Sequence, residues 1–192
     1  MIKKPRLTDI CHDKIGSLLR AGDCAIDATA GNGHDTLFLS RAVGETGHVI
    51  GFDIQASAIE STQLRLREYR APSKVTLILD SHDSMSKHIP ETCRSRIRAI
   101  VFNLGYLPGS NKRIITRAEE TLPAIEQALD LLMPGGLLSI MAYPGHSGGR
   151  EETDRVVDLI CSLEAEVFGT SVTRSESENG PALLMAIRHQ NS

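Results

Sequence analysis

The sequence has no long apolar run, and this absence sets the first limits on its function. Residues 1–6 are partly basic, but no apolar segment of signal-peptide or membrane-spanning length follows them. A transmembrane helix needs about 20 consecutive, predominantly apolar residues. We therefore expect a cytoplasmic protein with no membrane partner.

Cysteine motifs and metal-ligand spacings are also missing. The four cysteines form no C-x-x-C pair, and no group of histidines and cysteines has the spacing of a zinc site. No Ser/His/Asp arrangement stands out either. These absences disfavour metalloenzymes and hydrolases, and they predict no metal site. Buried thiols in a reducing compartment are expected at Cys11, Cys24, Cys93 and Cys161.

Positive charge is in slight deficit. Lysine and arginine together number 21 against 24 aspartates and glutamates, so the formal net charge is −3. Such a chain cannot wrap nucleic acid over its whole surface, although a local basic face is compatible with it. Lys112, Arg113 and Arg117 follow a loop at a predicted strand end. We expect them to grip phosphates there, whereas the other basic runs are expected to be solvated faces.

What the sequence does contain is a regular alternation of strand-like and helix-like segments in 192 residues, enough for one domain with a substantial core. This alternation is typical of a doubly wound α/β fold, with a mainly parallel sheet and helices on both faces. The seven predicted strands cover residues 24–28, 48–52, 75–79, 97–102, 137–142, 166–173 and 182–188. The last two strands are expected to form a C-terminal antiparallel hairpin. We predict one domain over residues 1–192, with an N-terminal helix in 1–22 and a Rossmann-like core in 23–192.

A proline marks the helix that precedes the fifth strand. Pro123 is expected in the first turn of this helix, where its missing N–H costs nothing. Residues 116–120 are then expected to form a separate short turn before it.

A glycine-containing loop follows the first predicted strand. Gly31 and Gly33 match the start of G-x-G-x-x-G, but Thr36 occupies the place of the third glycine. Asp53 ends the second strand, at the spacing of a carboxylate that binds ribose hydroxyls. Thr36 disfavours a pyrophosphate cofactor, and so does the negative charge of Asp27. Asp53 could instead cap the helix after it.

The same loop suits a cofactor with an amino-acid tail. Asp27 or Asp35 can receive an ammonium group, and the N–H groups of the loop can receive a carboxylate. That description fits S-adenosylmethionine. Ser81, His82 and Asp83 follow the third strand, where they can contact an adenine edge, although helix capping explains Asp83 equally well.

Two further strand ends indicate an amine acceptor. Asn103 and Tyr106 match the ends of a motif of amino-group methyltransferases, in which Asn or Asp precedes Pro-Pro and an aromatic residue. In that motif an amide oxygen and a backbone carbonyl orient the target amine, and the aromatic ring stacks on the base. The glycine-rich residues 143–149 suggest a loop on the substrate side. His146 could assist proton removal there, or it could be a solvated loop histidine.

Five motifs, in this order, resemble the small class I methyltransferases of the MnmM (YtqB) family. They are DATAGNGHDT (27–36), FDIQ (52–55), DSHD (80–83), NLGYLPG (103–109) and YPGHSGG (143–149). The resemblance runs over nearly the whole chain and implies a Rossmann-like class I methyltransferase. It also implies a tRNA methyltransferase, which would bind the anticodon stem-loop. The implied reaction moves a methyl group from S-adenosylmethionine to the amine of 5-aminomethyl-2-thiouridine at the wobble position, giving 5-methylaminomethyl-2-thiouridine.

The resemblance also implies roles for individual residues. Cofactor contacts are expected from Asp27, Thr29, Gly31, Asn32, Gly33, Asp35, Thr36, Asp53, Ile54, Gln55, Ser81, His82 and Asn103. Catalytic roles are expected for Asn103, Tyr106 and His146. Substrate contacts are expected from Leu104, Gly105, Tyr106, Tyr143, Lys112 and Arg113.

Two alternatives and one question of assembly stay open at this point. The acceptor could be another amine, in rRNA or in a small molecule, or the chain could be a non-catalytic module that binds S-adenosylmethionine or a nucleotide. The Asn103 to Tyr106 loop speaks against the second alternative. A homodimer would help a small chain with few basic residues to grasp a tRNA, and the sequence leaves this open.

Overall fold

The computed structural model describes residues 5–107, 109, 114–177 and 179–190. Its seven strands form a single sheet in the order β3-β2-β1-β4-β5-β7-β6. The strands are β1 (Cys24–Asp27), β2 (His48–Asp53), β3 (Lys74–Leu79), β4 (Ile97–Leu104), β5 (Leu132–Ala142), β6 (Phe168–Arg174) and β7 (Ala182–Arg188). The helices are α1 (Leu7–Leu18), α2 (His34–Val43), α3 (Ala56–Glu68), α4 (Ala118–Leu131) and α5 (Gly149–Cys161), with 3₁₀ helices η1 (His82–Lys87) and η2 (Glu91–Cys93).

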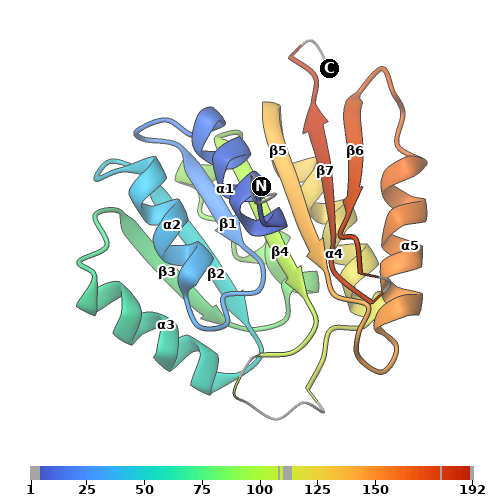
Figure 1. Ribbon diagram of the computed structural model, residues 1–192. Helices are drawn as coiled ribbons and strands as arrows, with labels where there is room; N and C mark the ends of the chain where they lie inside the picture. Colours follow the sequence, from blue (N-terminus) through green and yellow to red (C-terminus); the bar gives the residue numbers. More distant parts are fainter. Residues whose placement is uncertain (1–4, 108, 110–113, 178, 191–192) are drawn as a thin grey trace.

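The strand directions agree with the predicted fold class. Strands β3, β2, β1, β4 and β5 are parallel. Strand β7 runs antiparallel between β5 and β6, so the predicted C-terminal hairpin is confirmed. Figure 1 shows α1 and α2 in front of the sheet and α4 behind it. This is the predicted Rossmann-like sheet with helices on both faces.

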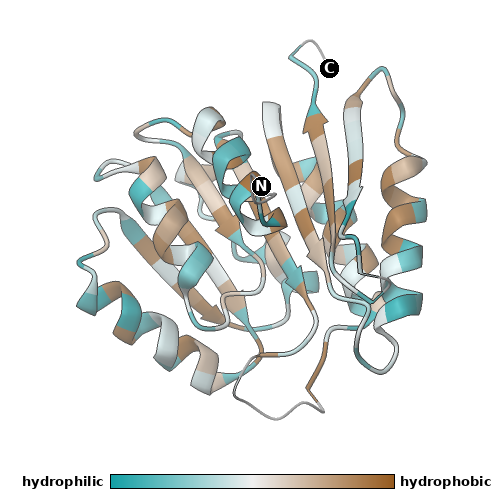
Figure 2. Ribbon diagram, viewed as in Figure 1, coloured by the Kyte–Doolittle hydropathy of each residue, from teal (hydrophilic) through white to brown (hydrophobic). Residues whose placement is uncertain are grey.

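Two apolar clusters fill the space between the sheet and its helices. Alternate residues of β4 belong to different clusters: Ile100 and Phe102 pack beneath α4 and α5, whereas Ala99 and Val101 pack beneath α1 and α2. This alternation follows from the period of two in a strand. Figure 2 shows apolar colours along the strands of the sheet and polar colours on much of the outer helix surface.

Several predicted boundaries are corrected by the structure. Strand β4 extends to Leu104, so Asn103 is the second-to-last residue of the strand and does not lie in the following loop. Helix α4 begins at Ala118, which leaves Pro123 in its second turn and not in its first. The helix tolerates this exposed proline because its other face is buried, and tertiary packing outweighs one missing backbone hydrogen bond. Cys161 is exposed, unlike the other three thiols.

The parallel strands bring their carboxyl ends to one edge of the sheet. The order of the strands reverses between β1 and β4, and ligands of open α/β sheets bind at such a switch point, outside the carboxyl ends of the strands. The five loops singled out in the sequence therefore share one side of the molecule. Within the described residues, no helix is both long and apolar enough to cross a membrane.

Candidate active site

The loop between β1 and α2 is shaped by two glycines with left-handed backbone conformations. The φ angles are 54° at Gly31 and 75° at Gly33. A Cβ atom on Gly33 would lie 2.9 Å from the Thr62 Cα atom, so the approach of α3 excludes any side chain there. The Thr62 hydroxyl donates to the Gly31 carbonyl at 3.1 Å. The glycines are thus required by the local geometry, and the loop is pinned against α3.

Asp53 connects this loop to the end of β2. Its carboxylate accepts the backbone N–H of Gly31 at 2.9 Å through Oδ2, and that of Gln55 at 2.9 Å through Oδ1. Burial raises the pKa of Asp53, and the backbone donors oppose that rise. Each oxygen retains a further lone pair, so the carboxylate can still accept hydrogen bonds from two ribose hydroxyls. Ile54, which follows it, is 52% exposed at this edge.

Asp27 is fully buried at the end of β1. It accepts the Thr36 hydroxyl at 2.6 Å and the Thr29 N–H at 3.2 Å. Burial and then the neighbouring Asp35 carboxylate raise the pKa of Asp27 to about 7. The structure therefore places Asp27 and Thr36 beneath the loop, bonded to each other, and places Asp35 closer to solvent.

Asp35 lies at the centre of a hydrogen-bonded chain of three side chains. Its Oδ1 atom is 2.7 Å from His12 Nε2, and its Oδ2 atom accepts the Asn103 amide N–H at 2.7 Å. His12 stacks on Phe38 with ring centroids 4.0 Å apart and planes 7° apart. Helix α1 thereby supplies a residue to the site, which the sequence analysis did not foresee.

His12 and Asp35 each favour the charged form of the other. Burial tends to raise the pKa of Asp35, but the hydrogen bonds from His12 and Asn103 outweigh it, and the pKa is lowered overall. The hydrogen bond to Asp35 in turn raises the pKa of His12. Because the Asn103 amide nitrogen donates to Asp35, the amide oxygen is the atom left to accept from another group.

The ends of β4 and β1 are tied together beside this chain. The Asn103 backbone N–H donates to the Thr29 hydroxyl oxygen at 2.7 Å. Leu107 lies over the glycine loop, with its Cδ1 atom 3.4 Å from the position of a Cβ on Gly31. The predicted cofactor loop and the predicted amine-binding loop are therefore adjacent.

Tyr106, Tyr143 and His146 gather beyond Asn103. The rings of Tyr106 and His146 meet edge to face, with centroids 6.4 Å apart and planes at 88°. The Tyr143 N–H donates to the Leu104 carbonyl at 3.2 Å, which fixes the start of the loop after β5. A Cβ on Gly105 would lie 3.7 Å from Tyr143 and 3.9 Å from His146, so the four predicted residues do converge.

His146 has one nitrogen engaged and one without a protein partner. Its Nδ1 atom lies 3.1 Å from the Ser147 carbonyl, which selects the tautomer with the proton on Nδ1. Its Nε2 atom is buried and, among the described residues, has no hydrogen-bond partner. A buried nitrogen in this state is suited to accept a proton from a bound group.

Ser81 and His82, after β3, carry two more buried polar atoms without partners. The Ser81 hydroxyl and the His82 Nε2 atom make no hydrogen bond within the described residues. His82 meets Phe102 edge to face, with ring centroids 5.6 Å apart, and its burial lowers its pKa. Unsatisfied buried polar atoms are rare in folded proteins, and a polar ligand edge would satisfy these two. The residues at this edge fit S-adenosylmethionine in this respect.

Glu152 holds the segment that leads from the loop after β4 into α4. It is a second residue that the sequence alone did not indicate. This buried carboxylate accepts the Thr116 hydroxyl at 2.8 Å and the Thr121 hydroxyl at 2.6 Å. The Thr116 N–H donates to the Gly105 carbonyl at 2.9 Å. The predicted phosphate contacts Lys112 and Arg113 lie outside the described residues.

No local pattern could have identified His12 or Glu152. Each lies on an amphipathic helix. The hydrogen-bond partner of His12 is 23 residues away in the sequence, and those of Glu152 are 31 and 36 residues away. Only co-variation between such distant positions among homologous sequences could have indicated them.

Comparisons with known proteins agree with this geometry. A family model described as "Putative rRNA methylase" matches residues 49–188. A curated relative is the "tRNA (mnm(5)s(2)U34)-methyltransferase, chloroplastic" of Arabidopsis thaliana, 39% identical over 181 residues. The match covers 90% of this chain but 62% of that relative, so this chain spans less than two thirds of its length.

Two solved structures resemble this chain along nearly all of its length. One is the "putative rRNA-methylase" of Clostridium thermocellum, with 36% identity, a TM-score of 0.91, and coverage of 97% of this chain and 100% of that chain. The other is a "putative methyltransferase" of Streptococcus mutans in complex with SAH, with 36% identity and a TM-score of 0.83. That match covers 98% of this chain and 99% of the other.

Proposed function

This chain belongs to the family described as "Putative rRNA methylase", and from that premise we propose that it is an S-adenosylmethionine-dependent tRNA methyltransferase. Its acceptor is the amine of 5-aminomethyl-2-thiouridine at the wobble position, and its product is 5-methylaminomethyl-2-thiouridine. The name of the Arabidopsis thaliana relative, a tRNA (mnm(5)s(2)U34)-methyltransferase, supports this acceptor. The partner is the anticodon stem-loop of tRNA, and the compartment is the cytoplasm.

The cofactor is held by residues from three strand ends. Asp53 accepts the ribose hydroxyls, Ile54 lies against the base, and Ser81 and His82 bind the adenine edge. The loop that contains Gly31 receives the carboxylate of the amino-acid tail. S-adenosylmethionine supplies an electrophilic methyl group when it is bound. The SAH of the Streptococcus mutans structure supports this cofactor.

The amine is oriented by Asn103 and deprotonated beside it. An alkyl amine is mostly protonated at neutral pH, because its pKa resembles that of lysine, about 10.4. The Asn103 amide oxygen accepts an N–H of the amine and directs the nitrogen lone pair into the crevice. The His146 Nε2 atom receives the proton that the amine loses. Tyr106 and Tyr143 flank the base. Positioning of this kind supplies much of the rate enhancement.

The observation that carries the proposal is the hydrogen bond from the Asn103 amide to Asp35, 2.7 Å long. It leaves the amide oxygen as an acceptor at the edge where the glycine loop, the Ser81 hydroxyl and the His146 ring also lie. A module that only bound a nucleotide would not need an oriented acceptor at this position.

The test is nucleoside mass spectrometry on tRNA from cells that lack this protein. We expect 5-aminomethyl-2-thiouridine to accumulate and the methylated product to disappear. Wild-type protein should restore the product, and an Asn103→Ala variant should not. An unchanged nucleoside profile in the deletion strain rejects the proposal.

A second candidate acceptor is an amine in rRNA, which the description of the family favours. Purified enzyme with labelled S-adenosylmethionine, offered tRNA and rRNA from the deletion strain separately, distinguishes the two. The proposed function expects label in tRNA alone.

A further inference from the structure

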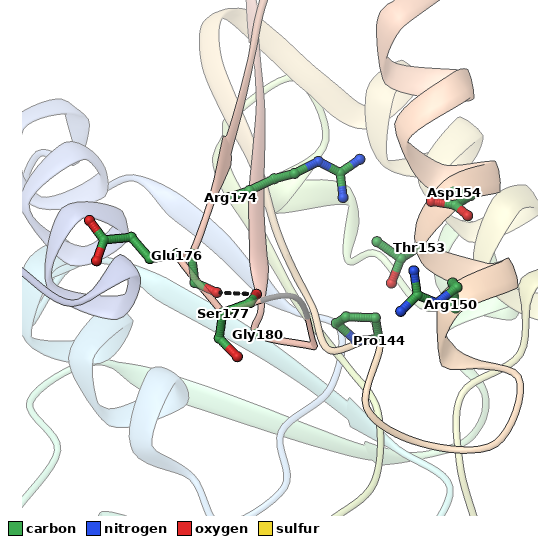
Figure 3. Close-up of a pocket in the computed structure, with 9 residues that line it drawn as sticks. Pro144, Arg150, Thr153, Asp154, Arg174, Glu176, Ser177 and Gly180 are labelled. Carbon is green, nitrogen blue, oxygen red and sulfur yellow. Dashed lines mark hydrogen bonds between the residues drawn. The ribbon is translucent and has the colours of Figure 1, made fainter.

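A polar hollow of about 170 Å³ lies beside the substrate loop, and the function proposed above makes no use of it. It is formed between the loop after β5, the first turns of α5, and the turn that joins β6 to β7. Its lining includes Pro144, Arg150, Asp154, Arg174 and Glu176. Figure 3 shows the side chains of Arg150 and Arg174 entering the same space from opposite sides.

The sheet register places this hollow at the same edge as the candidate active site. Leu104 of β4 pairs with Ala142 of β5, Ala142 pairs with Ala182 of β7, and Ala182 pairs with Arg174 of β6. These four residues form one row across neighbouring strands. With strands about 4.8 Å apart, Arg174 begins about 15 Å from Leu104, three strand spacings along the edge.

The hollow is also joined directly to the substrate loop. Pro144 belongs to both. A Cβ on Gly145 would lie 3.6 Å from the Asn179 carbonyl oxygen, and the Arg150 Nη2 atom donates to the Asn179 side chain at 3.0 Å. The loop and the β6–β7 turn therefore form one continuous surface.

The charge in the hollow favours an anion. In the part of the chain that the structure describes, neither Arg150 nor Arg174 makes an ion pair, whereas Arg98 and Arg155 are each paired with a carboxylate. The carboxylate of Glu176 extends away from the two guanidinium groups in Figure 3. The lining contains two guanidinium groups and two carboxylates, and of the carboxylates Asp154 lies nearer the guanidinium groups than Glu176 does in Figure 3.

We propose that this hollow binds a backbone phosphate of the RNA strand that carries the methylated base. This inference rests on the proposed function, because it takes the substrate to be a polyanion. Successive phosphates of a stacked strand are about 3.4 Å apart along its axis, so a separation of about 15 Å corresponds to a few nucleotides. Guanidinium groups bind phosphate oxygens in a fork, and such contacts orient a nucleic acid without reading its sequence.

The experiment measures binding of a labelled anticodon stem-loop by fluorescence anisotropy at several salt concentrations. For the double variant Arg150→Ala and Arg174→Ala, we expect weaker binding and a shallower dependence of log Kd on log salt, by about 0.7 for each phosphate contact that is lost. KM for the stem-loop should rise, while kcat and the affinity for SAH stay unchanged. Arg174→Lys should keep most of the salt dependence, because it keeps the charge.

The matched control is Arg20→Ala, an exposed arginine that follows α1 near the amino ends of the strands. It should bind the stem-loop like the wild type. If the double variant also binds RNA like the wild type, or if it loses affinity for inorganic phosphate but not for RNA, the inference is overturned. Failure of the proposed function is distinguishable, because the wild type would then leave the stem-loop unmethylated whether or not the arginines affect binding.

Discussion

At the scale of single residues, the site depends on where each side chain's hydrogen-bonding atoms are already engaged. Asn103 uses its amide nitrogen on Asp35, and His146 has Nδ1 beside the Ser147 carbonyl. Each therefore presents a single acceptor atom. Asp27 differs from Asp35 in burial: Asp27 is fully buried and hydrogen-bonded to Thr36 and Thr29, whereas the Asp35 side chain is partly exposed. Of the two carboxylates that the sequence offered for an ammonium group, the structure favours Asp35.

Replacing Asn103 tests the oriented acceptor. Asn103→Ala should lower turnover by at least about 10²-fold, the typical cost of losing one positioned polar group in a transition state. Affinity for SAH, measured by calorimetry, should stay close to that of the wild type, because most of the proposed cofactor contacts lie on the ends of β1, β2 and β3. Turnover at the wild-type level would show that another atom orients the amine.

The pair of His12 and Asp35 predicts a specific dependence of stability on pH. The folded-state pKa of His12 is raised, so its contribution is fully present below the unfolded-state value of about 6.5 and is lost as the pH rises through the higher folded value. Urea unfolding of the wild type and of His12→Gln should therefore differ most at mildly acidic pH and converge at alkaline pH. The lowered pKa of Asp35 affects stability in a separate, more acidic pH range, because the contribution of Asp35 to stability is lost as the pH falls through its folded-state pKa.

A difference that stays constant across the pH range would contradict the charged interaction. His12→Gln also tests positioning: if His12 acts through Asp35 on Asn103, the variant should change the pH profile of kcat, whereas a residue that only stabilised the fold would not.

At the scale of the elements, the site is assembled by three helix attachments. Helix α1 contributes His12, helix α3 approaches Gly33 through Thr62, and helix α5 contributes Glu152 to the threonines at the start of α4. None of these contacts is local in sequence. Each fixes one of the loops at the carboxyl edge of the sheet.

Two glycines at helix starts provide a matched test of the α3 attachment. Gly33 and Gly148 precede α2 and α5 with φ angles of 75° and 78°. A Cβ on Gly33 meets the Thr62 backbone at 2.9 Å, whereas a Cβ on Gly148 meets nothing within 4 Å. Gly148→Ala should cost about 1–2 kcal/mol of unfolding free energy for its backbone conformation. Gly33→Ala should cost about 1–3 kcal/mol more, because the backbone must move. Equal losses of unfolding free energy for the two variants would mean that α3 can move away from residue 33 at no cost.

At the scale of the whole molecule, the proposed cofactor site draws on the ends of three strands, β1, β2 and β3. A ligand that binds only the folded state at 100 times its Kd adds about 2.7 kcal/mol of stability. For a domain of this size that corresponds to a rise in Tm of about 5–10 °C. SAH should produce this shift in a thermal melt, and Asp53→Ala should reduce it at the same concentration. An identical shift in the variant would remove Asp53 from the cofactor site.

The sequence by itself determined the order of strands and helices, the edge of the sheet at which the candidate site lies, and most of the residues at the strand ends. These properties follow from apolar periodicity, from glycine and proline positions, and from the rule that parallel strands place their carboxyl ends together. Gly31, Asp53, Ser81 and Asn103 could be assigned to one crevice because each follows or ends a recognisable strand.

Only the tertiary structure decided which atoms of these residues remain available. The burial of Asp27, the chain from His12 through Asp35 to Asn103, and the anchoring of Thr116 by Glu152 all join segments that are distant in the sequence. Helix positions such as Pro123 depend likewise on which face packs against the sheet. The physical reason is that a hydrogen bond between distant side chains depends on how helices dock on the sheet, and periodicity within one segment carries no record of that docking.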